Sequence, residues 1–240
     1  ALAATRAGRL REPARPRGQI VKYLDYKRRL IDRFIANRQK QIELLNQQIV
    51  AIINKAVTKG NDSNVKMKSS GLKWIGDIPE DWNVMDLKRI IDPKRPITYG
   101  IVQPGEEDIN GRFMIRGQDY SQGWAKAATI FRVSDEVEVP YKRARVVEGD
   151  ILITIVGAGC GNIAVVPDWL TGANLTQTTA RLAIDKRFHV SEFFYYVLRS
   201  KIGMGNVDMY VKGAAQPGLN IGYIKVFKLT VPPKHIQNDV

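Results

Sequence analysis

Residues 19–60 constrain the fold of this chain more than any other segment. They contain no proline, and no glycine before Gly60, and their apolar residues recur in alternating steps of three and four. That period of about 3.5 residues is typical of a helix that packs along its length against another helix. At about 1.5 Å per residue, we expect a rod of roughly 60 Å. Only two positions of this seam, Arg28 and Arg38, are charged. The seam consists of Val21, Leu24, Arg28, Ile31, Ile35, Arg38, Ile42, Leu45, Ile49, Ile52 and Ala56.

The composition favours one ordinary globular domain beside this rod. Of the 240 residues, 44% are hydrophobic and 25% are charged, and about 170 residues suit a single domain. No run approaches the roughly eighteen apolar residues of a membrane span, and the first residues lack the apolar core of a secretory signal. Cys160 is the single cysteine, and it stands far from His189 and His235. We therefore expect a chain of the reducing cytoplasm, with no membrane contact, disulfide or metal.

The net charge of +13 indicates a polyanionic partner, most often nucleic acid. Residues 1–66 carry 15 Lys and Arg against 5 Asp and Glu, and the remaining residues carry 22 against 19. A solvated cationic helix face is therefore an alternative interpretation. Residues 1–18 are of low complexity, contain Pro13 and Pro16 and have no apolar period. We expect them to be a disordered leader or a segment derived from expression, outside the fold.

The texture of the sequence changes after Gly60, which is expected to end the helix as its C′ residue. Residues 61–70 form a linker, and residues 71–233 form a domain in which turn formers separate short β-branched runs at intervals of about ten. Residues 234–240 begin a further segment with no element of its own. The expected fold class is α+β: a long coiled-coil helix followed by a mainly β domain of mixed strands.

The expected elements of the domain are short. One helix, residues 191–201 with Ser191 as its N-cap, interrupts the strands. The expected strands are residues 113–115, 128–133, 137–139, 151–156, 163–166, 180–184 and 226–231.

Residues 157–161, Gly-Ala-Gly-Cys-Gly, follow the apolar run 151–156. A dinucleotide site needs glycines spaced G-x-G-x-x-G that open a helix, because the helix N-terminus meets the pyrophosphate. Here the spacing is G-x-G-x-G, and residues 162–167 are strand-like and end at a proline. The pattern favours a glycine-rich hairpin that brings its backbone close to a ligand or another strand.

The sequence contains no recognisable catalytic arrangement. Phosphate-loop, metalloprotease and hydrolase signatures are absent, and Val231 precedes Pro232-Pro233 where an adenine methyltransferase motif would have Asn or Asp. Glu148 with Asp150, and Asp185 beside Lys186, fall at expected strand or turn edges, where we expect solvated carboxylates. We therefore expect a protein without catalytic residues.

Polar residues of base-reading types gather on glycine-rich turns of the domain. Arg and Lys pair with guanine edges and Asn and Gln with adenine edges, while hydroxyl and basic side chains hold phosphates. Polar loop residues are usually plain surface, but three clusters in a domain without enzyme motifs favour binding. The clusters are residues 116–120 (Arg-Gly-Gln-Asp-Tyr), Asn174 with Gln177, Thr178 and Thr179, and Lys212 with Gln216 and Asn220.

Five segments follow one another in a specific order. They are the helix 20–60, residues 68–82 (KSSGLKWIGDIPEDW), 99–105 (YGIVQPG), 149–156 and 213–220 (GAAQPGLN), with Pro232, Pro233 and Gln237 at the exit. Through these segments the chain resembles the DNA-specificity subunit of type I restriction-modification systems. The resemblance covers almost all residues after Gly18. The helix is similar to the spacer helix of that family, and the other segments are similar to the entrance, interior and exit of its target-recognition domain.

The resemblance implies a non-catalytic subunit in which two recognition domains, held apart by two antiparallel helices, each read half of an interrupted DNA sequence. It also implies methyltransferase subunits that carry S-adenosylmethionine and restriction subunits that hydrolyse ATP, so this chain is expected to hold no cofactor. With one domain and one helix, the chain is expected to be a fragment or a half-subunit.

For such a chain the seam predicts an antiparallel homodimer. Arg28 and Arg38 on that seam either reach a carboxylate of the other helix or leave the seam locally wet. The residues expected in the helix contact are Leu24, Ile31, Ile35, Ile42, Leu45, Ile49 and Ile52.

The resemblance also implies that loops of the domain meet double-stranded DNA. Arg116 and Gln118 are the first candidates for base edges, whereas Lys142, Arg143, Arg145 and Lys212 are candidates for phosphates. An alternative of a different class is a scaffold module that docks partner subunits through its helix without direct DNA contact. The DNA-binding set is Tyr99, Arg116, Gln118, Tyr120, Lys142, Arg143, Arg145, Asn174, Gln177, Thr178, Lys212, Gln216 and Asn220.

Overall fold

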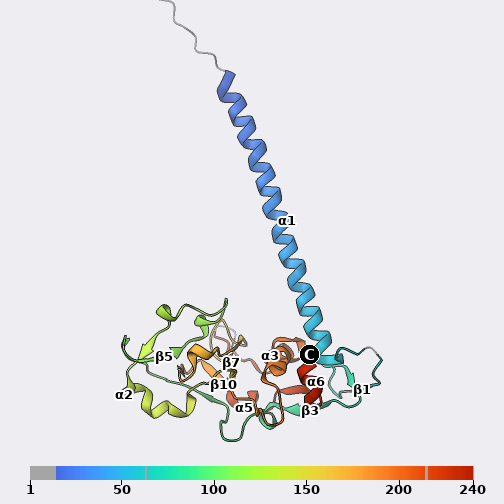
Figure 1. Ribbon diagram of the computed structural model, residues 1–240, viewed down its shortest axis with the longest axis vertical. Coiled ribbons are helices and arrows are strands. Elements are labelled where there is room, and N and C mark those ends of the chain that lie inside the picture. Colours follow the sequence, from blue (N-terminus) through green and yellow to red (C-terminus); the bar gives the residue numbers. More distant parts are fainter. Residues whose placement is uncertain (1–14, 63, 214–215, 240) are drawn as a thin grey trace, which may run out of the picture. The chain divides into compact units, whose positions relative to one another are not determined.

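The computed structural model describes residues 15–62, 64–213 and 216–239. Expectations for residues 1–14, Ser63, Ala214, Ala215 and Val240 lie outside the described residues. The chain divides into two compact units, Ala1–Ile49 and Val50–Val240. The described part of the first unit consists of helix α1, and the last turns of α1 belong to the second unit with all other elements (Figure 1).

Helix α1 spans Arg15–Lys59, which confirms the long N-terminal helix. It begins earlier than expected, with Pro16 in its first turn. Proline is tolerated at this place because the N–H groups of the first turn have no intrahelical partner, and because its fixed φ suits a helix. The expectation that residues 15–18 lie outside the fold is therefore wrong. At the other end, Gly60 has a φ of +70° and donates its N–H to the carbonyl of Ala56 at 3.0 Å, which is the expected C-cap. Within the described residues, no helix combines the length and apolarity that a membrane crossing needs.

The second unit is a mixed α/β domain with several small sheets, which confirms the α+β class. The largest sheet has the order β4-β10-β7-β8 and is antiparallel throughout. In the sheet β6-β5-β9, strands β5 and β9 are parallel, and β1-β2 and β11-β3 form antiparallel pairs. The strands are β1 Met67–Ser69, β2 Asp77–Pro79, β3 Asn83–Asp86, β4 Thr98–Tyr99, β5 Arg112–Ile115, β6 Arg132–Val133, β7 Ile151–Thr154, β8 Ile163–Val165, β9 Asn174–Leu175, β10 Thr179–Leu182 and β11 Lys228–Val231.

The domain contains more helix than the sequence led us to expect. Two consecutive helices replace the single helix at 191–201, and a helix follows the last strand. The helices are α2 Asp135–Glu138, α3 Ser191–Arg199, α4 Lys201–Tyr210, α5 Ile221–Ile224 and α6 Lys234–Asp239, with short 3₁₀ helices η1 Leu87–Arg89, η2 Gly117–Asp119, η3 Ala127–Thr129, η4 Val139–Ala144 and η5 Asp168–Leu170.

Three local expectations are wrong for identifiable reasons. Residues 137–139 lie in α2 and η4 rather than in a strand, because Ser134 caps the N–H of Val137 and acidic residues fill the first turn. Much of 128–133 is likewise η3 and loop, with only a two-residue strand at its end. Val190, not Ser191, is the N-cap of α3, and the side chain of Gln237 accepts the N–H of Val190 at 2.8 Å.

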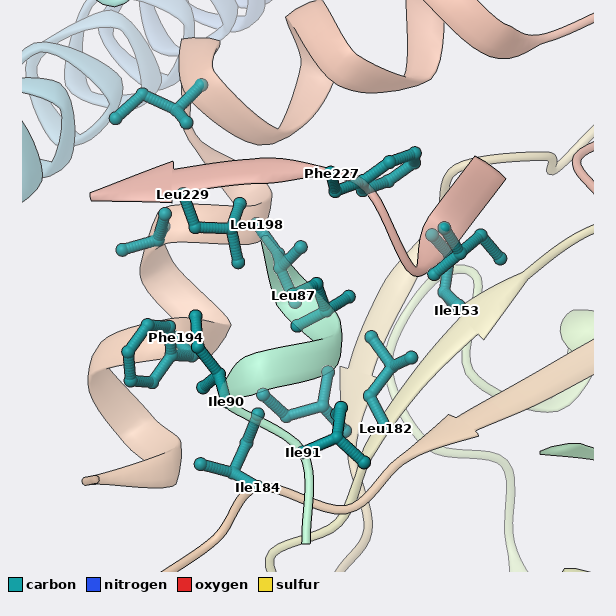
Figure 2. Close-up of a cluster of buried hydrophobic side chains, with 14 of the residues drawn as sticks. Leu87, Ile90, Ile91, Ile153, Leu182, Ile184, Phe194, Leu198, Phe227 and Leu229 are labelled. Carbon is teal, nitrogen blue, oxygen red and sulfur yellow. The ribbon is translucent and has the colours of Figure 1, made fainter. Parts of the chain in front are cut away.

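The two central strands of the four-stranded sheet, β7 and β10, are buried along their whole length. Ile151 and Ile153 of β7 face the larger core, whereas Leu152 faces a second cluster that contains Ile115 and Leu175, because successive strand side chains point to opposite faces. In the larger core, side chains of the sheet meet η1, α3 and β11, as Figure 2 shows. The residues labelled there are Leu87, Ile90, Ile91, Ile153, Leu182, Ile184, Phe194, Leu198, Phe227 and Leu229.

The last turns of α1 are part of this core. Val57 is fully buried, and its carbonyl accepts a hydrogen bond from the hydroxyl of Thr230 in β11 at 2.8 Å. The side-chain amide of Asn61 donates to the carbonyl of Asp239 at 2.7 Å. The entrance and the exit of the domain are therefore held next to each other.

Candidate nucleic-acid interface

One end of the four-stranded sheet gathers most of the predicted reading loops. Strands β4 and β7 end there and β8 and β10 begin there, because Thr154 pairs with Thr179, Tyr99 with Ala180, and Ile153 with Ile163. We call the segments at this end the loop edge. It comprises residues 99–101, 117–118, 154–162, 176–179, 212–213 and 216–220.

Backbone hydrogen bonds join the segments of the loop edge. Gly100 donates to the carbonyl of Thr176 at 3.1 Å, and Gln177 donates to the carbonyl of Ile101 at 2.8 Å. A Cβ on Gly100 would lie 1.8 Å from the carbonyl oxygen of Leu175, so this close approach requires glycine. The loops after β4 and β9 are thus held in one fixed register.

The glycine-rich segment 157–161 is a hairpin between β7 and β8, as the sequence predicted. Gly157 donates to the carbonyl of Pro217 at 2.9 Å, and Leu219 donates to the carbonyl of Ile155 at 2.8 Å. The hairpin therefore fixes residues 216–220 beside β7. Its glycines have a structural role in this contact, and no helix follows them.

Several predicted reading residues are accessible at the loop edge. Tyr99 is 40% exposed, and Gln118, Gln177 and Gln216 are also exposed. None of these side chains has a hydrogen-bond partner within the described part of the chain. Their amide and hydroxyl groups are free to meet an external ligand.

Three further candidates at the loop edge are accessible but already engaged. The ammonium of Lys212 lies 3.2 Å from the hydroxyl of Tyr223, and Asn220 caps α5 by accepting the N–H of Gly222 at 2.7 Å. The hydroxyl of Thr178 lies 2.8 Å from that of Thr176. These residues order the edge as well as lining it.

Arg116, the first candidate for a base edge, is held by its own loop. Its guanidinium donates to both carboxylate oxygens of Asp119, at 3.2 and 3.0 Å, and lies over the ring of Phe131. Because Asp119 is buried, this pair orders the turn that presents Gln118. Base contact by Arg116 stays a prediction, but Gln118 is the freer of the two side chains.

Two candidates are not at the surface. Asn174 lies in β9 rather than in a loop and is fully buried, and its side-chain amide donates to Glu138 at 3.1 Å. Tyr120 is 6% exposed, and its hydroxyl lies 2.6 Å from that of Thr154, while burial raises the pKa of this phenol. The expectation that both lie in accessible loops is wrong, because each finds an internal partner far away in the sequence. We therefore leave both out of the proposed DNA contacts.

The cationic candidates Lys142, Arg143 and Arg145 lie on and just after η4, outside the segments that form the loop edge. Lys142 and Arg143 are exposed. The guanidinium of Arg145 makes two 2.6 Å hydrogen bonds to the buried carboxylate of Glu138. Arg145 therefore stabilises the fold. That Lys142 and Arg143 contact DNA phosphates stays a prediction.

Two acidic residues that were expected to be solvated are instead buried. Asp150 is 2% exposed, and Arg95 pairs with both of its oxygens at 2.7 and 2.6 Å. Asp185 is 7% exposed and pairs with Arg187 at 2.7 Å. The pKa of Asp185 falls to about 2, chiefly because of the hydrogen bond from Arg187. Both carboxylates are committed to structural ion pairs.

A cavity of about 930 Å³ lies beside β8 and α3, and its wall includes Tyr120, Glu148, Glu192, Tyr195 and Arg199. Apart from Tyr120, the predicted DNA-binding residues do not line it. Among the described residues, no group of three His, Cys, Asp or Glu is placed to hold a metal ion.

Asn162 was not among the predicted residues, although it follows the glycine-rich hairpin and is exposed at the loop edge. Its carbonyl accepts the N–H of Thr154 at 2.9 Å, so its position is fixed by the sheet. An exposed Asn directly after a glycine-rich turn was a usable signal, because Asn is a base-reading type.

Comparison with known proteins gives a consistent result, although no family model matches the chain. The chain is 32% identical over 163 residues to the EcoBI specificity subunit of Escherichia coli, a type I restriction enzyme, covering 68% of this chain and 34% of that protein. It is 25% identical over 204 residues to the MjaVIII specificity subunit of Methanocaldococcus jannaschii, covering 84% of this chain and 47% of that protein.

Solved structures share the fold. The HsdS subunit from Thermoanaerobacter tengcongensis matches with a TM-score of 0.53 at 17% identity, over 92% of this chain and 46% of that chain. A chain from a structural study of complex assembly and conformational transition of the type I restriction-modification system matches with a TM-score of 0.60 at 17% identity, over 92% and 47%.

A long helix that leads into a mixed domain with several small sheets is therefore an architecture shared with restriction-modification subunits. More particularly, the chain is a homologue of the specificity subunits of type I restriction-modification systems. It spans between about a third and a half of the length of the relatives it matches, with 34% of one and 47% of another.

Proposed function

We propose that this chain is the DNA-recognition part of a type I restriction-modification complex and reads one half of a bipartite target. The loop edge carries the proposal, because it presents free amide and hydroxyl side chains from separate segments on one rigid sheet end in a homologue of specificity subunits. Tyr99, Gln118, Gln177 and Gln216 are the proposed base-reading set. The chain itself is non-catalytic and without a cofactor, and acts in the cytoplasm. Methyltransferase and restriction subunits bring S-adenosylmethionine and ATP.

The physical basis is positional. Specific readout needs side chains held at base edges while other contacts fix the register. At the loop edge, ladder hydrogen bonds to β7 and β10 hold the segments that carry Gln177 and Gln216, and the Arg116–Asp119 pair orders the turn that carries Gln118. Variation of these side chains would change the target without changing the sheet.

Helix α1 supplies the second half of the proposal, an antiparallel homodimer through its seam. The seam residues Leu24, Ile31, Ile42 and Ile52 are between 58% and 66% exposed in the single chain. Such an apolar stripe, interrupted only by Arg28 and Arg38, favours an interaction surface. In a pair, a helix of 45 residues would hold two reading domains apart with a rod of about 68 Å.

The two arginines of the seam are partly satisfied within their own helix. Arg28 lies 3.8 Å from Asp32, and Arg38 donates to Gln41 at 2.8 Å and lies over the ring of Phe34. Both the cross-helix ion pair and the locally wet seam remain compatible with these contacts.

Selection from duplexes with a randomised segment tests the reading role. The wild-type chain should enrich one half-site, and Gln118→Ala or Gln177→Ala should relax the preference at individual positions, by about 1–3 kcal/mol for each bidentate base pairing that the substitution removes. Gln47→Ala, a matched change on the side of α1 opposite the seam, should leave the selected sequence unchanged. If the wild-type chain enriches no sequence and its affinity does not fall with salt, the DNA-recognition proposal is wrong.

Sedimentation of seam variants tests the pairing. Ile42→Asp would bury a carboxylate in each half of the contact, and we expect dimerisation to weaken about 100-fold or more, which corresponds to about 3 kcal/mol. Gln47→Asp, on the opposite side of the helix, is the control and should leave the dimer intact. A wild-type chain that stays monomeric at all concentrations would remove the spacer role.

The alternative is a scaffold module whose helix docks partner subunits without DNA contact. It predicts that the chain co-purifies with its methyltransferase subunit and that substitutions at the loop edge leave every DNA measurement unchanged.

A further inference from the structure

A second polar site lies in the domain where α1 ends. A cavity of about 350 Å³ opens between the last turns of α1, residues 74–75 and the start of α4. Three lysines, Lys55, Lys59 and Lys201, line it, and no acidic residue does. All three lysines are exposed, and all belong to the compact unit Val50–Val240.

The positive charges in this cavity are not balanced locally. Lys55 and Lys59 stand four positions apart on one helix face, where like charges destabilise a helix by a few tenths of a kcal/mol. Lys201 adds a third ammonium from α4. In the described part of the chain, none of the three lies within 4.0 Å of a carboxylate. Such an arrangement favours an external anion.

The other polar groups of the cavity are engaged within the domain or buried. Asn54 accepts the backbone N–H of Lys201 at 2.8 Å, and Thr58 donates its hydroxyl to the carbonyl of Asn54 at 2.6 Å. The indole N–H of Trp74, which also lines the cavity, finds no acceptor among the described residues. Three exposed ammonium groups suit an oxyanion such as phosphate.

The cavity is connected to the loop edge by a single rigid element. Helix α4 runs from Lys201, at the cavity, to Tyr210, which stacks on Tyr223 beside Lys212. Ten residues of helix separate the two ends by about 15 Å. A major groove is about 12 Å wide, so a backbone that flanks a base-reading surface lies at a comparable distance from it.

We infer that Lys55, Lys59 and Lys201 bind a backbone phosphate of duplex DNA next to the half-site that the loop edge reads. This inference rests on the proposed function and extends it with a contact that is independent of sequence. The contact fixes the register of the domain on the duplex, as phosphate contacts do.

The test is the salt dependence of DNA affinity for the full-length chain on a mixed-sequence duplex. Each phosphate contact contributes about 0.9 to the slope of log affinity against log salt. The loss of affinity on removal of one phosphate contact is therefore about eightfold greater at ~0.1 M salt than at 1 M. The variant K55Q/K59Q/K201Q should reduce the slope by about 1 unit. Its selected half-site should be that of the wild type.

The control removes the same charge elsewhere in the domain. Lys94, Lys126 and Lys225 are exposed and do not line the cavity, and K94Q/K126Q/K225Q should leave the slope closer to the wild-type value. An equal effect of both triple variants, or a wild-type slope in the cavity variant, overturns the inference and leaves the proposed function standing. A wild-type chain without salt-dependent binding overturns both. Inorganic phosphate at constant ionic strength should weaken DNA binding by the wild type more than by the cavity variant, and equal weakening of both would contradict the inference.

Discussion

Glu138 is the side chain whose replacement tests the domain most sharply. It is fully buried at the end of α2, and Arg145 meets its two carboxylate oxygens with hydrogen bonds of 2.6 Å each. Asn174 donates to the same carboxylate at 3.1 Å, and Arg112 lies 3.5 Å away. Arg145 is a near neighbour in the sequence, but Arg112 and Asn174 come from distant strands, so this carboxylate ties the η4 segment to β5 and β9.

Glu138→Gln keeps the shape of the side chain and removes its charge. One of its two acceptor oxygens becomes an NH₂ group, which then faces a guanidinium or amide donor. Removing one partner of a buried ion pair costs about 3–5 kcal/mol, and we expect the lower end because one acceptor remains. For a domain of this size about 3 kcal/mol corresponds to a fall in Tm of about 6–12 °C.

Thermal unfolding followed by circular dichroism at fixed protein concentration measures this change. Glu107→Gln, the same chemical change at an exposed loop position, is the control and should stay within about 0.5 kcal/mol of the wild type. If Glu138→Gln melts within about 2 °C of the wild type, the network does not carry the stability assigned to it.

The same network makes a pH prediction. The hydrogen bonds from Arg145, in first place, hold the pKa of Glu138 below its ordinary value of 4.5. Its stabilising contribution is therefore present above that value and disappears as the pH falls through the lowered pKa. The acid branch of the stability curve should flatten in Glu138→Gln, which acid titration of the melting temperature measures.

Three further predictions concern other groups. Asn174→Ala should lower the melting temperature and leave the selected DNA half-site unchanged, since this amide serves Glu138 and lies away from solvent; a changed half-site would contradict its structural role. Arg187 lowers the pKa of Asp185 from 3.8 to about 2. The pair therefore stabilises the fold above pH 3.8, and this stabilisation is lost as the pH falls through about 2. Asp185→Asn should remove this acid-dependent part of the stability. Burial raises the pKa of the Cys160 thiol, so Ellman's reagent should label the native chain at neutral pH much more slowly than the unfolded chain; equal rates would show an accessible thiolate.

Much of the fold could be predicted from the sequence where one local signal was strong. The 3.5-residue period and Gly60 predicted α1 and its C-terminal end. The short runs of β-branched and apolar residues between turn formers predicted β7, β10 and β11. Short apolar runs were ambiguous, and residues 137–139 became helical because Ser134 capped them.

The candidate site was predictable only in part. Gln118, Gln177 and Gln216 stand on glycine-rich turns and are exposed at one sheet end. Tyr120 and Asn174 have the same polar character in the sequence but are buried. The difference lies in their partners, Thr154 and Glu138, which stand 34 and 36 positions away.

The sequence by itself determined the helix with its apolar seam, the glycine turns and the kinship with specificity subunits, because each depends on residue type and short-range spacing. Only the tertiary structure decided which polar side chains are engaged inside the domain and which remain free, and it alone assembled the three lysines beside Trp74. Hydrogen bonds and ion pairs between distant segments form after the chain has folded back on itself, and no local pattern encodes their partners.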